Sequence, residues 1–273
     1  MTQSRAFRDL TRRALAGVAL AIAAAAMCGC RDFGDVNGSI PASAGTPADE
    51  AELRSYAENC RQRYERNSGE KSASIDYARA LRALTRYREA VAVMQTAAVK
   101  SPKDEAILGE YGKALADAGE LSQAKDVLTR AYTPDNPKWD IMSVQGAVAD
   151  QLGDHASAMQ FYRDALKIAP GEPGVLTNMG LSLALSRQLP EAERTLRQAV
   201  ASPKADARMR GDLALVLALE GKFTEAERVS LTDLPSEAAR GNVEAIRRML
   251  GASDSPREVD RPAKAASGAN DAG

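Results

Sequence analysis

Aromatic residues are scarce in this sequence, at 4% of 273 residues, and the formal net charge is only −1. A hydrophobic core must therefore be built mostly from alanine, leucine, valine and methionine. This favours closely packed helices and argues against a β-sandwich or barrel, because strands are usually rich in aromatic and β-branched residues. The near-zero charge gives no electrostatic reason to expect nucleic acid as a partner. We therefore expect an all-α protein.

The residues that usually carry catalysis and metal binding are also few. His155 is the only histidine, and the cysteines are Cys28, Cys30 and Cys60. One histidine cannot supply a usual zinc site together with so few thiols, and three cysteines form no disulfide framework. The glycine motifs of nucleotide-binding loops do not occur in the sequence. We expect no enzyme activity, no metal and no small-molecule substrate, with His155 at an exposed position.

Small residues recur every 34 residues in this sequence. They form three series, each called a column here. The first column is Ala78, Gly112, Gly146, Gly180 and Ala214; the second is Ala90, Ala124, Ala158, Ala192 and Ala226; the third is Ala97, Ala131, Ala165 and Ala199, and Asp233 breaks it. Self-similarity at this period indicates a helical solenoid. We expect the small residues to let two helices approach closely. Gly146→Leu or Ala158→Leu would then overpack the contact and cost about 1–3 kcal/mol.

The period divides the central part of the chain into five units. These are 71–104, 105–138, 139–172, 173–206 and 207–234. Each unit is expected to hold one helix at positions 2–14 and a second at positions 17–30. The turn between the two helices has a column of its own, which is Thr85, Gly119, Gly153, Arg187 and Gly221. Glycine predominates there because a helix C-terminus favours a left-handed residue.

Capping segments are expected on both sides of the repeats, because the terminal repeats of a solenoid need a polar cover. Residues 50–70 should contain a helix from about 50 to 67, with Cys60 on its apolar side as a buried, inert thiol; a redox-active Cys60 is the alternative. Residues 235–250 should contain a closing helix with Asn242 as its N-cap. The tail 251–273 is rich in Ser, Pro, Ala and Gly and is expected to be disordered.

The N-terminus has the pattern of an export signal. Four arginines precede an uncharged run from Ala14 to Met27, which is too short for a lasting membrane span. The run ends in Met27-Cys28-Gly29-Cys30, which resembles a bacterial lipobox. That resemblance implies a lipoprotein signal peptide over 1–29 and a covalent lipid with fatty acyl chains such as palmitate on Cys30. An ordinary signal peptide is the alternative. The segment 30–49 is short on apolar residues and rich in Gly, Ser and Pro, which predicts a flexible tether after the anchor.

The residue after the modified cysteine bears on the destination of the protein. It is Arg31 rather than the Asp associated with inner-membrane retention, which by analogy implies the outer membrane, facing the periplasm. Arg12 and Arg13 leave export through a twin-arginine pathway open beside the general route.

The units resemble tetratricopeptide repeats over residues 71–234. That family implies a right-handed superhelix whose concave face, formed by the first helix of each unit, holds partner peptides. The implied groove residues are Ser72, Ile75, Arg79, Arg82, Lys113 and Ala116 in the N-terminal half, and Thr177, Leu181, Ala184, Leu215 and Ala218 in the C-terminal half. We expect a groove that is basic at one end and apolar at the other; the alternative is that the basic residues are simply solvated. The family's Lys/Asn/Arg clamp for a terminal carboxylate is missing.

The whole chain resembles the lipoprotein of the tight-adherence (Tad/Flp) pilus assembly system. The resemblance rests on the lipobox at Cys30, on Asn178-Met179-Gly180-Leu181, and on the closing segments 233–235 and 242–250. It implies a scaffold that binds proteins of the pilus secretion machinery and helps the outer-membrane secretin to assemble. Two alternatives are an envelope adaptor for peptidoglycan hydrolases or proteases, and an accessory subunit of outer-membrane barrel insertion.

Overall fold

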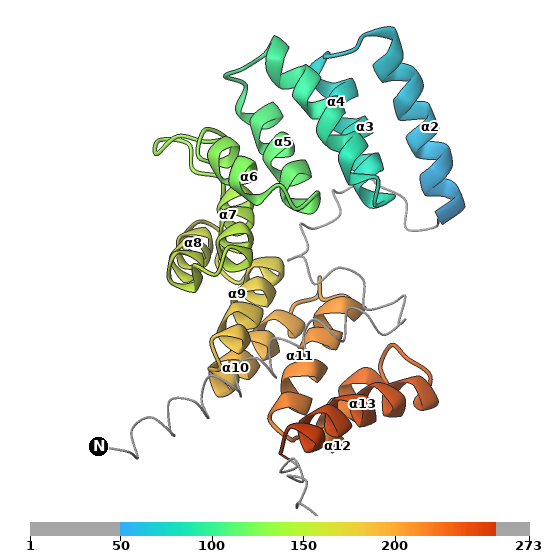
Figure 1. The fold of residues 1–273 in the computed structure, drawn as a ribbon, viewed down its shortest axis with the longest axis vertical. Helices are drawn as coiled ribbons and strands as arrows, with labels where there is room; N and C mark the ends of the chain where they lie inside the picture. The colour runs from blue at the N-terminus through green and yellow to red at the C-terminus, as the bar shows by residue number, and fades with distance from the viewer. Residues whose placement is uncertain (1–49, 255–273) are drawn as a thin grey trace, which may run out of the picture.

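The computed structural model describes residues 50–254, and every named element in that range is an α-helix (Figure 1). In chain order the helices are α2 (Glu50–Arg66), α3 (Lys71–Ala83), α4 (Tyr87–Lys100), α5 (Glu105–Asp117), α6 (Leu121–Leu128), α7 (Trp139–Gln151), α8 (His155–Ile168), α9 (Pro173–Leu185), α10 (Leu189–Val200), α11 (Ala207–Leu219), α12 (Phe223–Ser230) and α13 (Ser236–Asp254). They stack in chain order into a curved solenoid with α2 at one end and α13 at the other. The expected all-α solenoid is confirmed. The predicted signal peptide 1–29, the predicted lipidation site Cys30, the predicted tether 30–49 and residues 255–273 lie outside the described residues.

The first helix of every repeat unit has the same length and the same place in the unit. Helices α3, α5, α7, α9 and α11 are each 13 residues long and begin at the first residue of a unit, one residue earlier than expected. Several begin with a side-chain cap: the Asp104 carboxylate accepts backbone N–H groups of α5, and Asp206 does the same for α11. Such caps satisfy donors that have no partner inside the helix.

The turn between the two helices of each unit is left-handed in all five units. The φ angles are 57° at Thr85, 78° at Gly119, 81° at Gly153, 62° at Arg187 and 79° at Gly221. The two non-glycine members therefore adopt the conformation that the three glycines define, although a β-branched residue such as Thr85 is strained there. The predicted turn column is confirmed.

The columns of small residues mark the points of closest helix approach. All five alanines of the second column are fully buried. A Cβ added to Gly180 would lie 2.7 Å from Leu196 Cγ, and at Gly112 and Gly146 it would come closer still to Leu128 and Tyr162. The large side chain 16 residues later in the second helix therefore fills the space that glycine leaves.

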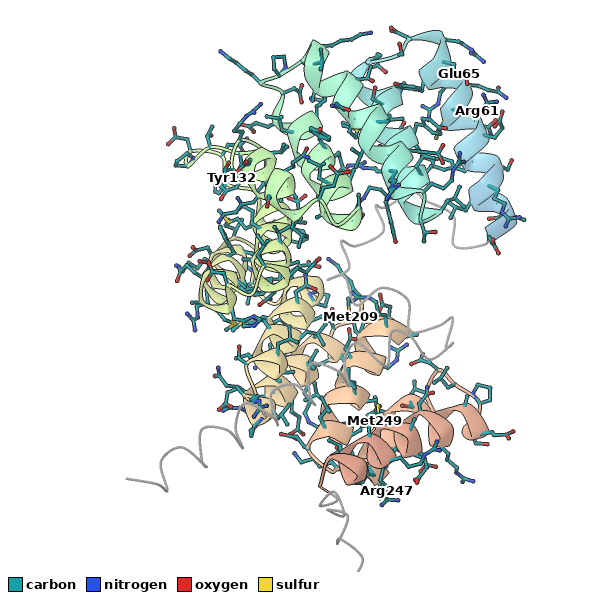
Figure 2. The ribbon with its side chains drawn as sticks, in the orientation of Figure 1. Arg61, Glu65, Tyr132, Met209, Arg247 and Met249 are labelled. Carbon is teal, nitrogen blue, oxygen red and sulfur yellow. The ribbon has the colours of Figure 1, made fainter. Side chains whose placement is uncertain are left out.

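The second helices are less regular than expected. Helices α6 and α12 are 8 residues long, whereas α4 and α8 have 14. After α6 the Thr129 hydroxyl donates to the Asp126 carbonyl, and Pro134 and Pro137 then prevent further helix. The loop reaches α7 through Tyr132, which lies between α6 and α7 and donates its hydroxyl to Gln145 Oε1 at 3.0 Å (Figure 2).

The end of the repeats differs from the expectation in two respects. Helix α13 begins at Ser236, so Asn242 lies inside it and is not its N-cap, and the helix continues through residues 251–254, which were expected to be disordered. Val243 and Ile246 nevertheless pack into the core of the last unit as expected. At the other end, Cys60 is fully buried on α2, as the inert-thiol interpretation requires.

Candidate protein-binding groove

The first helices α3, α5, α7, α9 and α11 form a continuous row, called here the first-helix row, in which each helix packs against the next. Two side chains at the sixth position of these helices reach back to the preceding first helix. Glu110 on α5 bonds Arg79 on α3, and Asn178 on α9 donates its Nδ2 to Ser143 Oγ on α7 at 3.2 Å. The row is therefore joined by polar contacts between successive units as well as by its apolar core.

Glu110 is the centre of an ion network at the N-terminal end of the row. Its carboxylate lies 3.0 Å from Arg79 Nη2, 3.1 Å from Lys113 Nζ and 3.5 Å from Arg82 Nη1. Only 6% of its side chain is exposed, against 11% for Arg82 and 10% for Lys113. A carboxylate this deeply buried is tolerable only because it is paired.

The electrostatics of Glu110 follow from these contacts. Burial by itself would raise the pKa of the carboxyl group. The charge of Lys113, the hydrogen bond from Arg79 and the charge of Arg82 outweigh burial and lower the pKa of Glu110 to about 2.

The expected basic surface at this end of the row is not present in the structure. Arg82 Nε lies 2.6 Å from Asp117, and Lys113 Nζ lies 2.9 Å from Asp140, in addition to their contacts with Glu110. Three cations thus face three carboxylates, and the alternative of simple solvation fails as well. Apart from the Lys113–Glu110 pair within α5, these contacts join neighbouring helices and could not be predicted from the pattern of one helix. A role of Arg79, Arg82 and Lys113 in partner binding stays a prediction.

The middle of the row holds a cluster around Asp150 at the end of α7. Its carboxylate accepts the hydroxyls of Tyr162 at 2.9 Å and Ser182 at 2.8 Å, and His155 Nδ1 lies 2.7 Å from it. His155 is 37% exposed, so its expected exposure is only partial. Ser182 bonds the carboxylate rather than the imidazole. The geometry is therefore not that of a nucleophile activated by histidine.

The expected groove residues of the C-terminal half divide into two groups. Thr177 and Ala218 are fully buried, so they cannot meet a partner directly, and the Thr177 hydroxyl donates to the Pro173 carbonyl at 2.8 Å. Leu181, Ala184 and Leu215 are partly exposed. The N-terminal residues show the same division, because Ile75 and Ala116 are buried whereas Ser72 is exposed.

Asp212 on α11 is a residue that the sequence interpretation did not single out. Its one hydrogen-bonding or ionic partner among the described residues is Arg208, whose Nη1 lies 3.5 Å from Asp212 Oδ2. Burial raises the pKa of Asp212 to about 6, and the Arg208 charge offsets this only in part. The sixth-position column at the 34-residue period (Asp76, Glu110, Val144, Asn178 and Asp212) would have identified it.

Two kinds of feature are absent from the described residues. No group of three histidine, cysteine, aspartate or glutamate side chains in residues 50–254 is placed to hold a metal ion. Within the same part of the chain, no helix has both the length and the apolar character to cross a bilayer.

A family model of the tetratricopeptide repeat matches residues 75–138, 114–173 and 177–231, which together make up more than half of the chain. The chain belongs to the tetratricopeptide-repeat family. Members of this family are generally protein-interaction scaffolds without enzymatic activity, so the fold implies protein partners. No curated protein sequence matches the chain.

Several solved structures share the fold. PilW, a widely conserved type IV pilus biogenesis factor, is similar with a TM-score of 0.61 and 15% identity, over 71% of this chain and 91% of that one. PilF of Pseudomonas aeruginosa has a TM-score of 0.56 and 15% identity, over 73% and 91% of the two chains. Cut9 in the APC/C hetero-tetramer Cut9–Hcn1 has a TM-score of 0.58 and 14% identity over 74% of this chain, which spans only 41% of that protein.

Proposed function

We propose that this protein is a non-enzymatic scaffold that binds partner proteins along the first-helix row and assists assembly of the Tad/Flp pilus secretion machinery. The observation that carries the proposal is the repeat solenoid itself, whose first helices present Leu181, Ala184 and Leu215 as partly exposed apolar side chains in one stretch of the row. A surface of this kind is suited to an extended or helical segment of another protein.

The pilus assignment draws on two lines of support. The first is the resemblance of the lipobox, the repeat segment around Asn178 and the closing segment to the Tad/Flp lipoprotein. The second is that the solved structures with this fold include a type IV pilus biogenesis factor, which at 15% identity is a likeness of fold. The secretin is the partner that the resemblance favours.

Lipidation of Cys30 would anchor this scaffold to the outer membrane, facing the periplasm. Two or more acyl chains are needed for stable anchoring, because a single chain binds only marginally. Cys30→Ser in the native host should leave a folded protein that no longer incorporates a fatty-acyl label and is released from membranes. Continued acyl labelling of that variant would show that another residue carries the lipid.

Affinity purification of the tagged full chain from crosslinked membranes of the native host tests the partner class. Recovery of the secretin and pilus assembly proteins supports the proposal. Recovery of peptidoglycan hydrolases in their place would contradict it and favour an envelope adaptor. Depletion of the protein should abolish pili without lowering outer-membrane barrel proteins in general; a general loss of barrels would also contradict the proposal.

A further inference from the structure

The acid at the centre of the Glu110 network has a counterpart three repeats later at which the three corresponding cations are replaced. Asp212 stands in unit five where Glu110 stands in unit two, at the sixth position of the first helix. Leu181, Ala184 and Leu215 occupy the positions that correspond, in the same order, to Arg79, Arg82 and Lys113. An acidic centre is thus retained in a nearly unchanged helical frame, while all three of its cationic partners are replaced by apolar residues.

The other donor that the register provides is also engaged elsewhere. In the preceding pair of units, Ser143 on α7 contacts the sixth-position side chain Asn178. The equivalent of Ser143 opposite Asp212 is Thr177, but the Thr177 hydroxyl donates to the carbonyl of Pro173 in its own helix. Among the described residues Asp212 therefore has Arg208 alone, which approaches Oδ2 at 3.5 Å, and nothing donates to Oδ1.

Asp212 is accessible from the row although most of its side chain is covered. Its side chain is 18% exposed, three times the 6% of Glu110, and Leu181, Ala184 and Leu215 are partly exposed beside it in the register. Figure 2 labels Met209, which lies on the same helix one turn before Asp212. Where Arg82 has a long side chain in unit one, Ala184 has only a methyl group.

We propose that Asp212 is an anionic subsite of the groove that receives the ammonium group of a lysine from a bound partner protein. The aliphatic part of that lysine lies along Leu181, Ala184 and Leu215, as lysine stems commonly do on apolar surfaces. Arg208 occupies Oδ2 of Asp212, so only Oδ1 is left for a ligand. A single oxygen suits a compact ammonium group better than a guanidinium, which favours two parallel hydrogen bonds. The bound lysine pairs with the Asp212 carboxylate, as Arg79, Arg82 and Lys113 pair with the Glu110 carboxylate.

This subsite rests on the proposed function, because it lies within the groove that would hold the partner. The probe is a library of random dodecapeptides, selected on the full-length chain in detergent. We expect the enriched peptides to share a lysine flanked by apolar residues. Replacing that lysine by norleucine, which keeps the stem and removes the charge, should weaken binding to the wild-type chain about tenfold or more, as expected for a hydrogen bond to a charged group.

Two variants locate the effect. In Asp212→Asn, and in Ala184→Arg, where the new guanidinium occupies the place of Arg82, lysine and norleucine peptides should bind equally. Asp126→Asn on α6, an exposed carboxylate outside the row, should keep the full preference for lysine. Thermal unfolding of each variant confirms that it is folded.

The outcomes separate the two proposals. A lysine preference that is unchanged in both Asp212→Asn and Ala184→Arg would overturn the subsite. Enriched peptides without a basic residue would also overturn it, while leaving the protein-binding groove supported. Failure of the wild-type chain to enrich any peptide would contradict the subsite and the groove together.

Discussion

The two ends of the first-helix row have the same helical arrangement but differ in the ionic partners of a largely covered carboxylate. Glu110 in unit two is held by three cations, and its pKa is lowered to about 2. Asp212 in unit five contacts one arginine, Arg208, at 3.5 Å, and burial raises its pKa to about 6. The first end has satisfied its charges internally. At the second end, Asp212 has Arg208 as its one cationic contact among the described residues. Under the proposed subsite, the same register position stabilises the fold in one unit and recognises a partner in another.

Glu110→Gln should produce the largest effect on stability. It removes the buried charge that three cations share, and breaking a buried ion pair from one side typically costs about 3–5 kcal/mol. Urea unfolding at pH 7 measures the loss. Asp126→Asn, which alters an exposed carboxylate on α6, should change the free energy of unfolding by less than about 0.5 kcal/mol. Equal stability of the two variants would show that the Glu110 network does not hold units one and two together.

Helix packing provides a second comparison of units two and five. Gly112→Ala should cost about 2 kcal/mol, because the new Cβ would overlap the buried side chain of Leu128. Gly211→Ala on α11, where a Cβ would meet nothing within 4 Å, should instead add up to about 1 kcal/mol through helix propensity. Thermal or urea unfolding of the pair measures both signs. A loss of the same size at both positions would show that glycine is required by the backbone and not by the neighbouring side chain.

Asp212→Asn should raise stability at pH 7 by roughly 1–2 kcal/mol, because it removes a charge that the fold desolvates without adequate pairing. The sign follows from linkage. The folded pKa of about 6 lies above the reference 3.8, so the folded state binds the proton more tightly and the wild type loses stability as pH rises from about 4 to 6.

The advantage of Asp212→Asn should therefore shrink as pH falls through 6 and vanish below about 4. Urea unfolding of both proteins between pH 4 and 7 measures this difference. An advantage that does not change with pH would mean that the Asp212 carboxyl does not titrate in this range. In that case the contrast with Glu110 would be lost.

Much of the fold could be predicted from the sequence, because the 34-residue period sets helix positions through local rules. The small columns and the left-handed turn column place every first helix to within one residue. The ends of α6, α12 and α13 could not be predicted, because they depend on side chains that compete locally with the helix. The Thr129 hydroxyl donates to the Asp126 carbonyl after α6. Asp233 stands where the third column would have alanine, and its carboxylate accepts two hydrogen bonds from Arg210.

The chemistry of the groove was harder to predict than its position. Arg82 and Lys113 were expected to be available to a partner. A cationic side chain is available only if it forms no ion pair with a carboxylate on the adjacent helix. Asp117 and Asp140 lie 35 and 27 residues away from them, and both distances fall outside any pattern within one helix. Leu181, Ala184 and Leu215 are partly exposed on the first-helix row, and their role in binding a partner stays a prediction.

The claim that the C-terminal end of the first-helix row holds a partner protein can be tested by site-specific photo-crosslinking in the native host. A photoreactive residue at Leu215, in the row, is compared with one at Val99, which is 77% exposed on the second helix of unit one. We expect a discrete protein adduct from position 215 that is absent from position 99 and is diminished by Asp212→Asn. The absence of any adduct at 215, or the same adducts at both positions, would contradict this account.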